Sequence, residues 1–199
     1  TTASNNTAIG SNALLANSTG AGNTAVGSVA GISITTGSNN SLFGYGAGDA
    51  LTTGASNVSI GAFSLSSATT ASSNTAIGTS TLTNNTSGAN NTAVGQSALT
   101  ANTTASFNTA IGSLAADALT AGDSNTAIGY AALSSDTLGE RAIAIGEGAL
   151  LTQNFTSETN NYNVAIGYNA GYAVTTGVQN TFIGGLAGDA TTTASNNTA

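Results

Sequence analysis

The chain offers few side chains that could carry out acid–base, nucleophilic or metal chemistry. It contains no histidine and no cysteine among its 199 residues, and its only cationic side chain is Arg141. Nucleophilic catalysis by Ser or Thr needs a neighbouring base such as His or Lys, and a Walker-type phosphate loop needs a lysine. Glu140, Glu147 and Glu158 lie in one region and could in principle work as paired carboxylates, but no matching partner set accompanies them. We therefore expect no enzymatic activity and no cofactor.

Charge and hydropathy argue against two further classes of partner. Eight carboxylates stand against one arginine, which gives a net charge of −7. A nucleic-acid-binding surface needs several Lys or Arg side chains to displace counterions from phosphates. A transmembrane helix needs about 18 or more consecutive apolar residues, and the sequence has no such run. We expect neither nucleic-acid binding nor membrane insertion and, without Cys or His, neither a disulfide nor a zinc site.

The elements that position these side chains follow from an internal repeat that covers the whole chain. The spacing of the repeat is 17 residues throughout, except for one unit of 21 residues that begins at Ala142. Residues 1–8 recur unchanged at 192–199. We interpret 1–199 as a single repeat array of eleven units, a window of a longer fibre, and number each unit from its first residue as position 1. The string Asn-Thr-Ala-Ile-Gly or a close variant begins at Asn6, Asn23, Asn40, Asn57, Asn74, Asn91, Asn108, Asn125, Ala142, Asn163 and Asn180.

Position 5 is glycine in every unit, which indicates a positive φ or a close backbone approach at a sharp turn. These structural turn glycines are Gly10, Gly27, Gly44, Gly61, Gly78, Gly95, Gly112, Gly129, Gly146, Gly167 and Gly184.

Position 4 is Ile or Val in ten units and Phe in the other, and position 3 is mostly Ala. Because successive side chains of a strand face opposite ways, the two positions must face different environments. We name the position-4 residues the core ladder: Ile9, Val26, Phe43, Ile60, Ile77, Val94, Ile111, Ile128, Ile145, Ile166 and Ile183.

The repeat length selects the fold class. Seventeen residues are too few for the helix pair of a helical solenoid, and Thr, Ile, Gly and Asn are weak helix formers. We predict an all-β parallel β-solenoid (β-roll) of eleven 17-residue coils, stacked in register so that Asn, Ile and Thr form ladders. One slim coil can bury only one of the Ala and Ile sets. We therefore expect Ala inside the coil and the core ladder between identical chains that associate around a common axis.

The one irregular unit carries four extra residues within about 153–162. They bring Phe155, Glu158 and Tyr162 close to Arg141 on a surface of otherwise small residues. Protruding loops of solenoids commonly make contacts, so these three residues form a candidate contact loop; the alternative is an insertion without a partner. Tyrosines at position 6 are expected to point outward, where they can stack on sugars, rest on neighbouring chains or cover a turn. They are Tyr45, Tyr130 and Tyr168.

Acidic side chains at position 10 raise the question of a calcium site. Asp49, Asp117 and Asp189 lie four units apart, and their spacing matches no calcium-loop pattern. We interpret them as solvated carboxylates that keep a fibre of low charge soluble.

Two stretches of the repeat carry a family likeness: residues 125–133, Asn-Thr-Ala-Ile-Gly-Tyr-Ala-Ala-Leu, and residues 91–99, Asn-Thr-Ala-Val-Gly-Gln-Ser-Ala-Leu. They resemble the head repeat of YadA-like trimeric autotransporter adhesins and the 17-residue arrays of tail-fibre-like proteins of phages and bacteria. The resemblance implies a left-handed parallel β-roll that forms a homotrimer at a cell surface or on a virion. We therefore expect an extracellular structural fibre whose partners are the chain itself and a cell-surface receptor or glycan.

Two other functions stay open. The matching residues at both ends of the window suit a self-assembling extracellular filament with end-to-end continuation. A regular Thr face could also order water in an ice-binding solenoid. The Thr pairs at positions 13 and 14, such as Thr35 and Thr36, are adjacent and so point to opposite faces. Position 13 alone gives one long Thr row.

Overall fold

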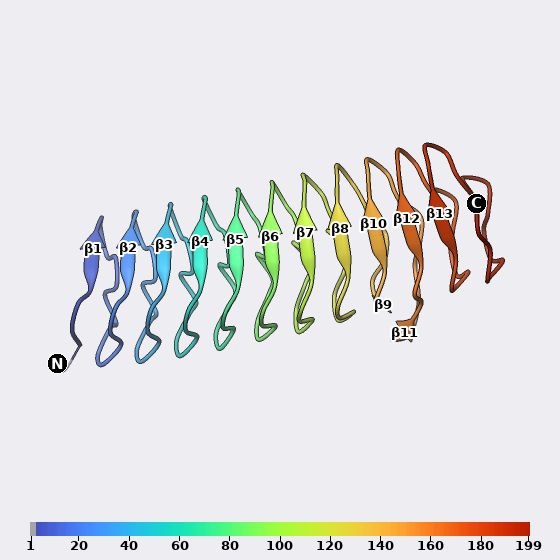
Figure 1. Cartoon of the computed structure of the whole chain (residues 1–199). Helices are drawn as coiled ribbons and strands as arrows, with labels where there is room; N and C mark the ends of the chain where they lie inside the picture. Colours follow the sequence, from blue (N-terminus) through green and yellow to red (C-terminus); the bar gives the residue numbers. More distant parts are fainter. Residues whose placement is uncertain (1–2) are drawn as a thin grey trace.

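The structure is a computed structural model and describes residues 3–199. The chain winds into a slender stack of coils, with one short strand of each coil lined up along the axis (Figure 1). The predicted all-β parallel β-solenoid with a 17-residue spacing is confirmed. Within residues 3–199 no helix is long and apolar enough to cross a membrane.

One strand per coil builds the large sheet, in which neighbours along the chain are neighbours in the sheet. A second sheet pairs two short strands, β9 (Gly139–Glu140) and β11 (Thr159–Asn160). The strands of the large sheet are β1 (Thr7–Ile9), β2 (Thr24–Val26), β3 (Ser41–Phe43), β4 (Val58–Ile60), β5 (Thr75–Ile77), β6 (Thr92–Val94), β7 (Thr109–Ile111), β8 (Thr126–Ile128), β10 (Ile143–Ile145), β12 (Val164–Ile166) and β13 (Thr181–Ile183).

The strands pair in parallel with equal repeat positions opposite one another. Between β7 and β8, for example, Ala110 lies opposite Ala127 and Ile111 opposite Ile128. The long unit keeps this register, because Ala144 of β10 still pairs with Ala165 of β12. A slip of one residue would move every buried alanine to the outer face, so the four extra residues loop out instead of shifting the strand.

The core of the coil consists of small side chains from the strand and larger ones from the returning segment. The middle residue of a strand, such as Ala76, Ala93 or Ala110, is fully buried. The core also contains leucines at position 9, such as Leu82 and Leu99, or, in coils where position 9 is Gly or Ala, aliphatic residues at position 12, such as Ile34 and Leu119. A coil of this width has room for one large side chain per layer, which explains why alanine dominates position 3.

Two coils depart from this rule, and glycine compensates in both. Leu42 replaces alanine at position 3 of the third coil, and glycine stands at position 9 of that coil and of the coil before it. A Cβ on Gly31 would lie only 2.7 Å from Leu42 Cδ1, and one on Gly48 3.0 Å from Leu42 Cδ2. Phe182 is matched in the same way by Gly171 and Gly188. At both places the larger side chain at position 3 thus fills the space that the position-9 leucines of two adjacent coils occupy elsewhere in the stack.

The core ladder lies outside the core of the single coil, as expected from the burial of Ala at position 3. Its residues stack in register, but they project from the outer face of the large sheet, where Ile60, Ile111 and Ile166 keep 39%, 39% and 36% of their surface exposed. The reason is the alternation along the strand, which turns position 4 outward once the alanine at position 3 faces inward. The expectation that a second chain covers the core ladder stays a prediction.

Candidate functional sites: the ladder face and the irregular coil

Positions 2 and 4 of the eleven strands form one continuous outer surface, which we name the ladder face. Position 4 contributes the core ladder, and position 2 contributes seven threonines together with Ser, Val and Ile. None of these eleven strands, all within residues 3–199, contains a charged residue, although the chain carries a net charge of −7. The position-2 residues are Thr7, Thr24, Ser41, Val58, Thr75, Thr92, Thr109, Thr126, Ile143, Val164 and Thr181.

The turn glycines lie directly after these strands. Their φ angles run from +129° to +141°, a region that residues with a Cβ rarely adopt. Stacking adds a second constraint, since a Cβ on Gly78 would lie 2.6 Å from the carbonyl oxygen of Gly95 in the next coil. Gly184 shares the backbone angle, but a Cβ there would meet only the Ala187 Cβ at 3.9 Å. The turn therefore requires glycine through its angle and, inside the stack, through the close approach of the next coil.

Position 1 supplies the buried polar ladder that the repeat predicted. The Asn57 side chain donates from Nδ2 to Asn40 Oδ1 at 3.0 Å and to the Ala71 carbonyl at 2.9 Å. Its backbone N–H also donates to Asn40 Oδ1 at 3.0 Å, and Asn74 repeats the pattern on Asn57. This one residue per coil therefore satisfies both the strand entry and the turn at the end of its own coil, which avoids the roughly 1–3 kcal/mol that a buried polar atom without a partner costs.

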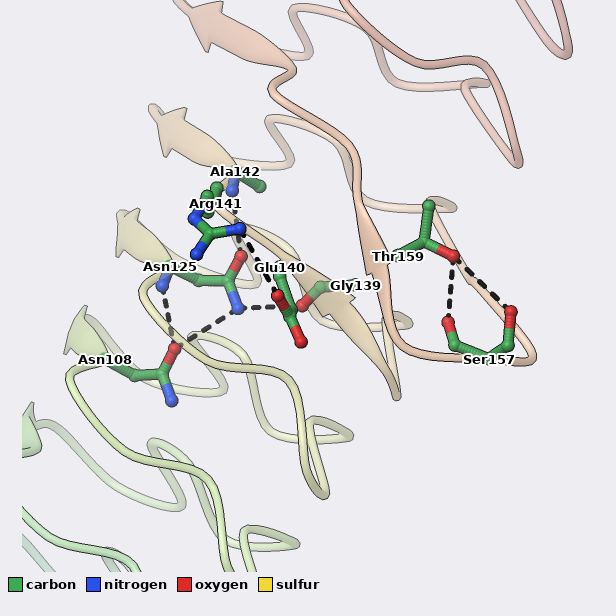
Figure 2. A network of polar contacts seen from close by, with 8 residues as sticks. All are labelled: Asn108, Asn125, Gly139, Glu140, Arg141, Ala142, Ser157 and Thr159. Atoms are coloured by element: carbon green, nitrogen blue, oxygen red, sulfur yellow. Dashed lines mark hydrogen bonds and ion pairs between the residues drawn. The ribbon is translucent and has the colours of Figure 1, made fainter.

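Ala142 interrupts the asparagine ladder at the start of the ninth coil. Its backbone N–H still donates to Asn125 Oδ1 at 2.9 Å (Figure 2), but it has no side-chain amide for the next coil. Asn163 binds two substitutes instead, with its N–H donating to Asn161 Oδ1 at 2.9 Å and its Nδ2 to Gln153 Oε1 at 2.8 Å. Gln153 and Asn161 therefore do locally what one asparagine does in a regular coil.

The substitute network ends on Asp136, which is completely buried. Gln153 Nε2 donates to Asp136 Oδ2 at 2.6 Å, and the N–H groups of Gly139 and Phe155 donate to Oδ1 at 3.0 and 3.2 Å. Burial raises the pKa of the Asp136 carboxyl, and these hydrogen bonds offset part of that effect. An ionised carboxylate only accepts hydrogen bonds, which suits a position approached by three donors.

Sequence reasoning missed Asp136, Gln153 and Asn161. The available signal was the loss of asparagine at Ala142 next to the only long unit, because a broken polar ladder must be completed by other residues. The identity of those residues depended on the path of the loop, which the spacing did not reveal.

The candidate contact loop is only partly available for contacts. Asn154 keeps its place in the stack through its N–H bond to the Thr175 carbonyl at 3.0 Å, so the extra residues lie within 155–162. Phe155 is 5% exposed and packs beside Gly139, where a Cβ would approach the Phe155 ring at 2.9 Å. Its prediction as a contact residue is wrong, because the loop turns this ring inward to cover the Asp136 network. Glu158 and Tyr162 are exposed.

Arg141 joins the loop to the preceding coil. Its Nη1 lies 3.7 Å from Glu140 Oε2 (Figure 2), and its Cζ lies 6.0 Å from the centre of the Tyr162 ring. Figure 2 also shows Ser157 and Thr159, where the Thr159 hydroxyl donates to the Ser157 carbonyl at 3.0 Å and lies 3.5 Å from the Ser157 hydroxyl.

Aromatic and threonine side chains form further rows on the surface. Tyr45, Tyr130 and Tyr168 at position 6 are 54%, 55% and 55% exposed. The position-13 hydroxyls donate along the stack, as from Thr52 Oγ1 to the Thr69 carbonyl at 3.0 Å. The position-13 hydroxyl groups therefore donate their hydrogen bonds to the protein itself.

The aspartates at position 10 remain separate from one another. Partial burial raises the pKa of both Asp49 and Asp117. In the part of the chain that the structure describes, no group of three or more His, Cys, Asp or Glu residues is arranged to hold a metal ion.

Comparison of the chain with protein-family models, with curated proteins and with solved structures finds no match.

Proposed function

We propose that the chain is a non-catalytic structural segment of an extracellular fibre, the shaft or head of an adhesin or of a phage tail-fibre-like protein. Identical chains, three in number, pack through their ladder faces around a common axis. A cell-surface receptor or glycan is the external partner of such a fibre. The number of chains and the extracellular setting follow from the resemblance of the repeat to trimeric adhesin heads and tail-fibre arrays.

The observation that carries this proposal is the ladder face itself. The coil fills its own core with Ala, Leu and the asparagine ladder, so the aliphatic residues at position 4 contribute little inside the chain. Covering a half-exposed Ile or Val contributes on the order of 1 kcal/mol, and the row repeats this gain in every coil. The face is long and uncharged, and its position-4 row is a continuous apolar stripe of the kind that interaction surfaces carry.

A second copy of the chain is the occupant that fits this face. Its coils have the same rise, roughly 4.8 Å per strand, so each aliphatic residue of one chain meets an equivalent residue of the next along the full length. The eight carboxylates lie off the eleven strands, so identical chains of like net charge meet through an uncharged surface. Self-association through equivalent surfaces is the usual arrangement for homo-oligomers.

The function of such a fibre is mechanical. Strand pairs, asparagine amides and position-13 hydroxyls all bond along the axis. Each coil is therefore held by its two neighbours, and the rod resists unfolding and proteolysis from its sides.

The mass of the assembled particle tests the proposal. One chain of 19.0 kDa stacked at roughly 4.8 Å per coil gives about 0.34 kDa per Å, so three chains give about 1.0 kDa per Å by electron microscopy. Ile77→Asp on the ladder face should abolish association in sedimentation experiments. Thr83→Asp, in the same coil but at a position where other coils carry aspartate, should leave it intact. A monomer at high concentration, or equal effects of the two variants, refutes the shared face.

Ice binding is a second candidate, favoured by one specific observation. Seven coils place Thr at position 2, and all seven carry an Ile or Val two residues later on the same outward face. The ladder face therefore has two outward-facing rows that lie two residues apart along the chain. The adjacent threonines at positions 13 and 14 lack this spacing. A monomeric rod with measurable freezing-point hysteresis would favour this function; a trimer without hysteresis would eliminate it.

A further inference from the structure

One exposed carboxylate lies between two tyrosines along the stack. Position 6 is Tyr130 in the eighth coil, Glu147 in the ninth and Tyr168 in the tenth; we name these three residues the position-6 triplet. The backbone keeps them in register, since Gly148 N–H donates to the Tyr130 carbonyl at 3.0 Å and Asn169 N–H to the Glu147 carbonyl at 2.9 Å. Both tyrosines are 55% exposed, and Glu147 is exposed.

The spacing of the triplet suits a cation. Successive coils lie roughly 4.8 Å apart, so a positive charge held by Glu147 lies about 5 Å along the axis from the position of each tyrosine. A cation is attracted by an aromatic face within about 6 Å of the ring centre. The triplet therefore offers one carboxylate and two aromatic groups to a single positive charge.

The molecule contains a filled counterpart of this arrangement. Arg141 lies 3.7 Å from the Glu140 carboxylate and 6.0 Å from the ring centre of Tyr162, which belongs to the next coil. A guanidinium group, a carboxylate and a tyrosine of the neighbouring coil thus already form one cluster on this stack. The position-6 triplet repeats the carboxylate and tyrosine part of that cluster and adds a second tyrosine.

The chain has no further cationic side chain to fill the triplet. Arg141 is its only Lys or Arg, and that residue is engaged by Glu140 and Tyr162. With a net charge of −7, the surface attracts a basic molecule and repels another acidic one. Residues 1–199 therefore leave a cation at Glu147 to be supplied from outside them.

We propose that the position-6 triplet binds an arginine side chain of a basic partner protein. The planar guanidinium stacks on aromatic rings and donates to a carboxylate at the same time, which the compact ammonium of lysine does less well. Tyr45, also at position 6, has Ser28 and Ala62 at the same position of the two adjacent coils, and its ring packs edge-on against the Phe63 ring with the centroids 5.1 Å apart. It serves as a comparison in which no carboxylate occupies position 6 of an adjacent coil. This inference does not depend on the number of chains in the fibre.

The test follows each tyrosine separately. The chain has five tyrosines, so ring-labelled protein gives five sets of NMR signals that single Tyr→Phe variants assign. Titration with N-acetyl-arginine amide at low salt should shift Tyr130 and Tyr168 in a saturable manner and leave Tyr45 unchanged. Glu147→Gln should weaken this binding by about two- to fivefold. Glu158→Gln, which removes the same charge from an exposed site outside the triplet, should not.

Three results would overturn the proposal. If Glu147→Gln and Glu158→Gln weaken the binding of N-acetyl-arginine amide equally, the binding depends only on the net charge of the chain. Equal shifts of the signals of all five tyrosines would lead to the same conclusion. Equal affinity for N-acetyl-lysine amide would show that the triplet does not prefer the guanidinium group of arginine. A stronger response to a neutral sugar, such as maltotriose, would assign the tyrosines to a glycan instead. Because all variants lie at exposed positions, an unchanged circular dichroism spectrum confirms that the coil is intact.

Discussion

In the regular coils one asparagine per coil completes the buried hydrogen bonds, whereas in the ninth coil three residues from different places share that work. Asn57 bonds the coil before it and the turn of its own coil through a single side chain. Where Ala142 replaces the asparagine, Gln153, Asn161 and Asp136 form the substitute network, and Phe155 covers it. The comparison teaches that a solenoid tolerates an irregular coil when the polar groups at the coil boundary keep their partners.

The largest effect is expected in a regular coil, where geometry leaves no alternative. Gly112→Ala combines a φ of +137° with a Cβ that overlaps the backbone of Gly129. We expect a loss of about 3–5 kcal/mol in the free energy of unfolding, since backbone strain and overpacking cost roughly 1–3 kcal/mol each. Denaturant unfolding measures it.

Gly184→Ala, made in the same 199-residue chain, is the matched control for that prediction. It carries the same strained angle, with φ at +138°, but no close backbone contact. A loss of only about 1–3 kcal/mol is expected. Equal losses at Gly112 and Gly184 would show that stacking adds nothing to the requirement for glycine.

The next effect probes the irregular coil. Gln153→Ala removes one partner of Asn163 and one partner of the buried Asp136 carboxylate, so we expect the free energy of unfolding to fall by about 2–3 kcal/mol. Gln96→Ala, an exposed glutamine in a regular coil, should change it by less than about 0.5 kcal/mol. Thermal and denaturant unfolding of both variants check this.

A double variant tests whether Gln153 acts as a stand-in for the missing asparagine. Ala142→Asn restores the regular residue at position 1, so the pair Ala142→Asn with Gln153→Ala should lose less stability than Gln153→Ala alone. Strict additivity of the two substitutions would refute the equivalence of the two networks.

The pH dependence of stability distinguishes the buried carboxylate from the exposed ones. Burial raises the folded-state pKa of Asp136 above its unfolded value of 3.8, so the folded state holds this proton more tightly than the unfolded state. The contribution of Asp136 is therefore largest below pH 3.8 and declines as pH rises through the raised pKa.

Comparison with Asp136→Asn isolates this contribution. The unfolding free energy of the wild type, taken relative to that of Asp136→Asn, should decrease as pH increases from about 3. The difference should become constant above the raised pKa of Asp136. A difference that moves the opposite way would mean that the three hydrogen bonds outweigh the desolvation of the carboxylate.

The smallest effect is expected on the surface of the irregular coil. Arg141→Gln removes the exposed ion pair with Glu140 and the contact with Tyr162, each worth roughly 0.2–1 kcal/mol. Faster hydrogen exchange of the loop at 155–162, with the regular coils unchanged, is the expected result. Global destabilisation would instead give Arg141 a role in the whole stack.

Much of the fold could be predicted because the repeat makes every coil equivalent. The period set the coil, the glycine at position 5 set the turn, and Ala at position 3 marked the inner face. The same equivalence predicted the asparagine ladder, because identical residues in register must bond to one another. The loop of the irregular coil could not be predicted in this way, since its four extra residues have no counterpart in other units.

The sequence by itself therefore determined the all-β parallel solenoid, its 17-residue register and the opposite orientation of Ala and Ile, since these depend only on periodicity and local backbone geometry. The tertiary structure decided how the space inside the closed coil is filled: Leu42 and Phe182 stand in place of Ala at position 3 where position 9 is glycine. It also decided that Phe155 turns inward and that Asp136, Gln153 and Asn161 complete the broken ladder. Those contacts depend on where a looped-out segment folds back, and that path is set by packing between coils rather than by spacing along the chain.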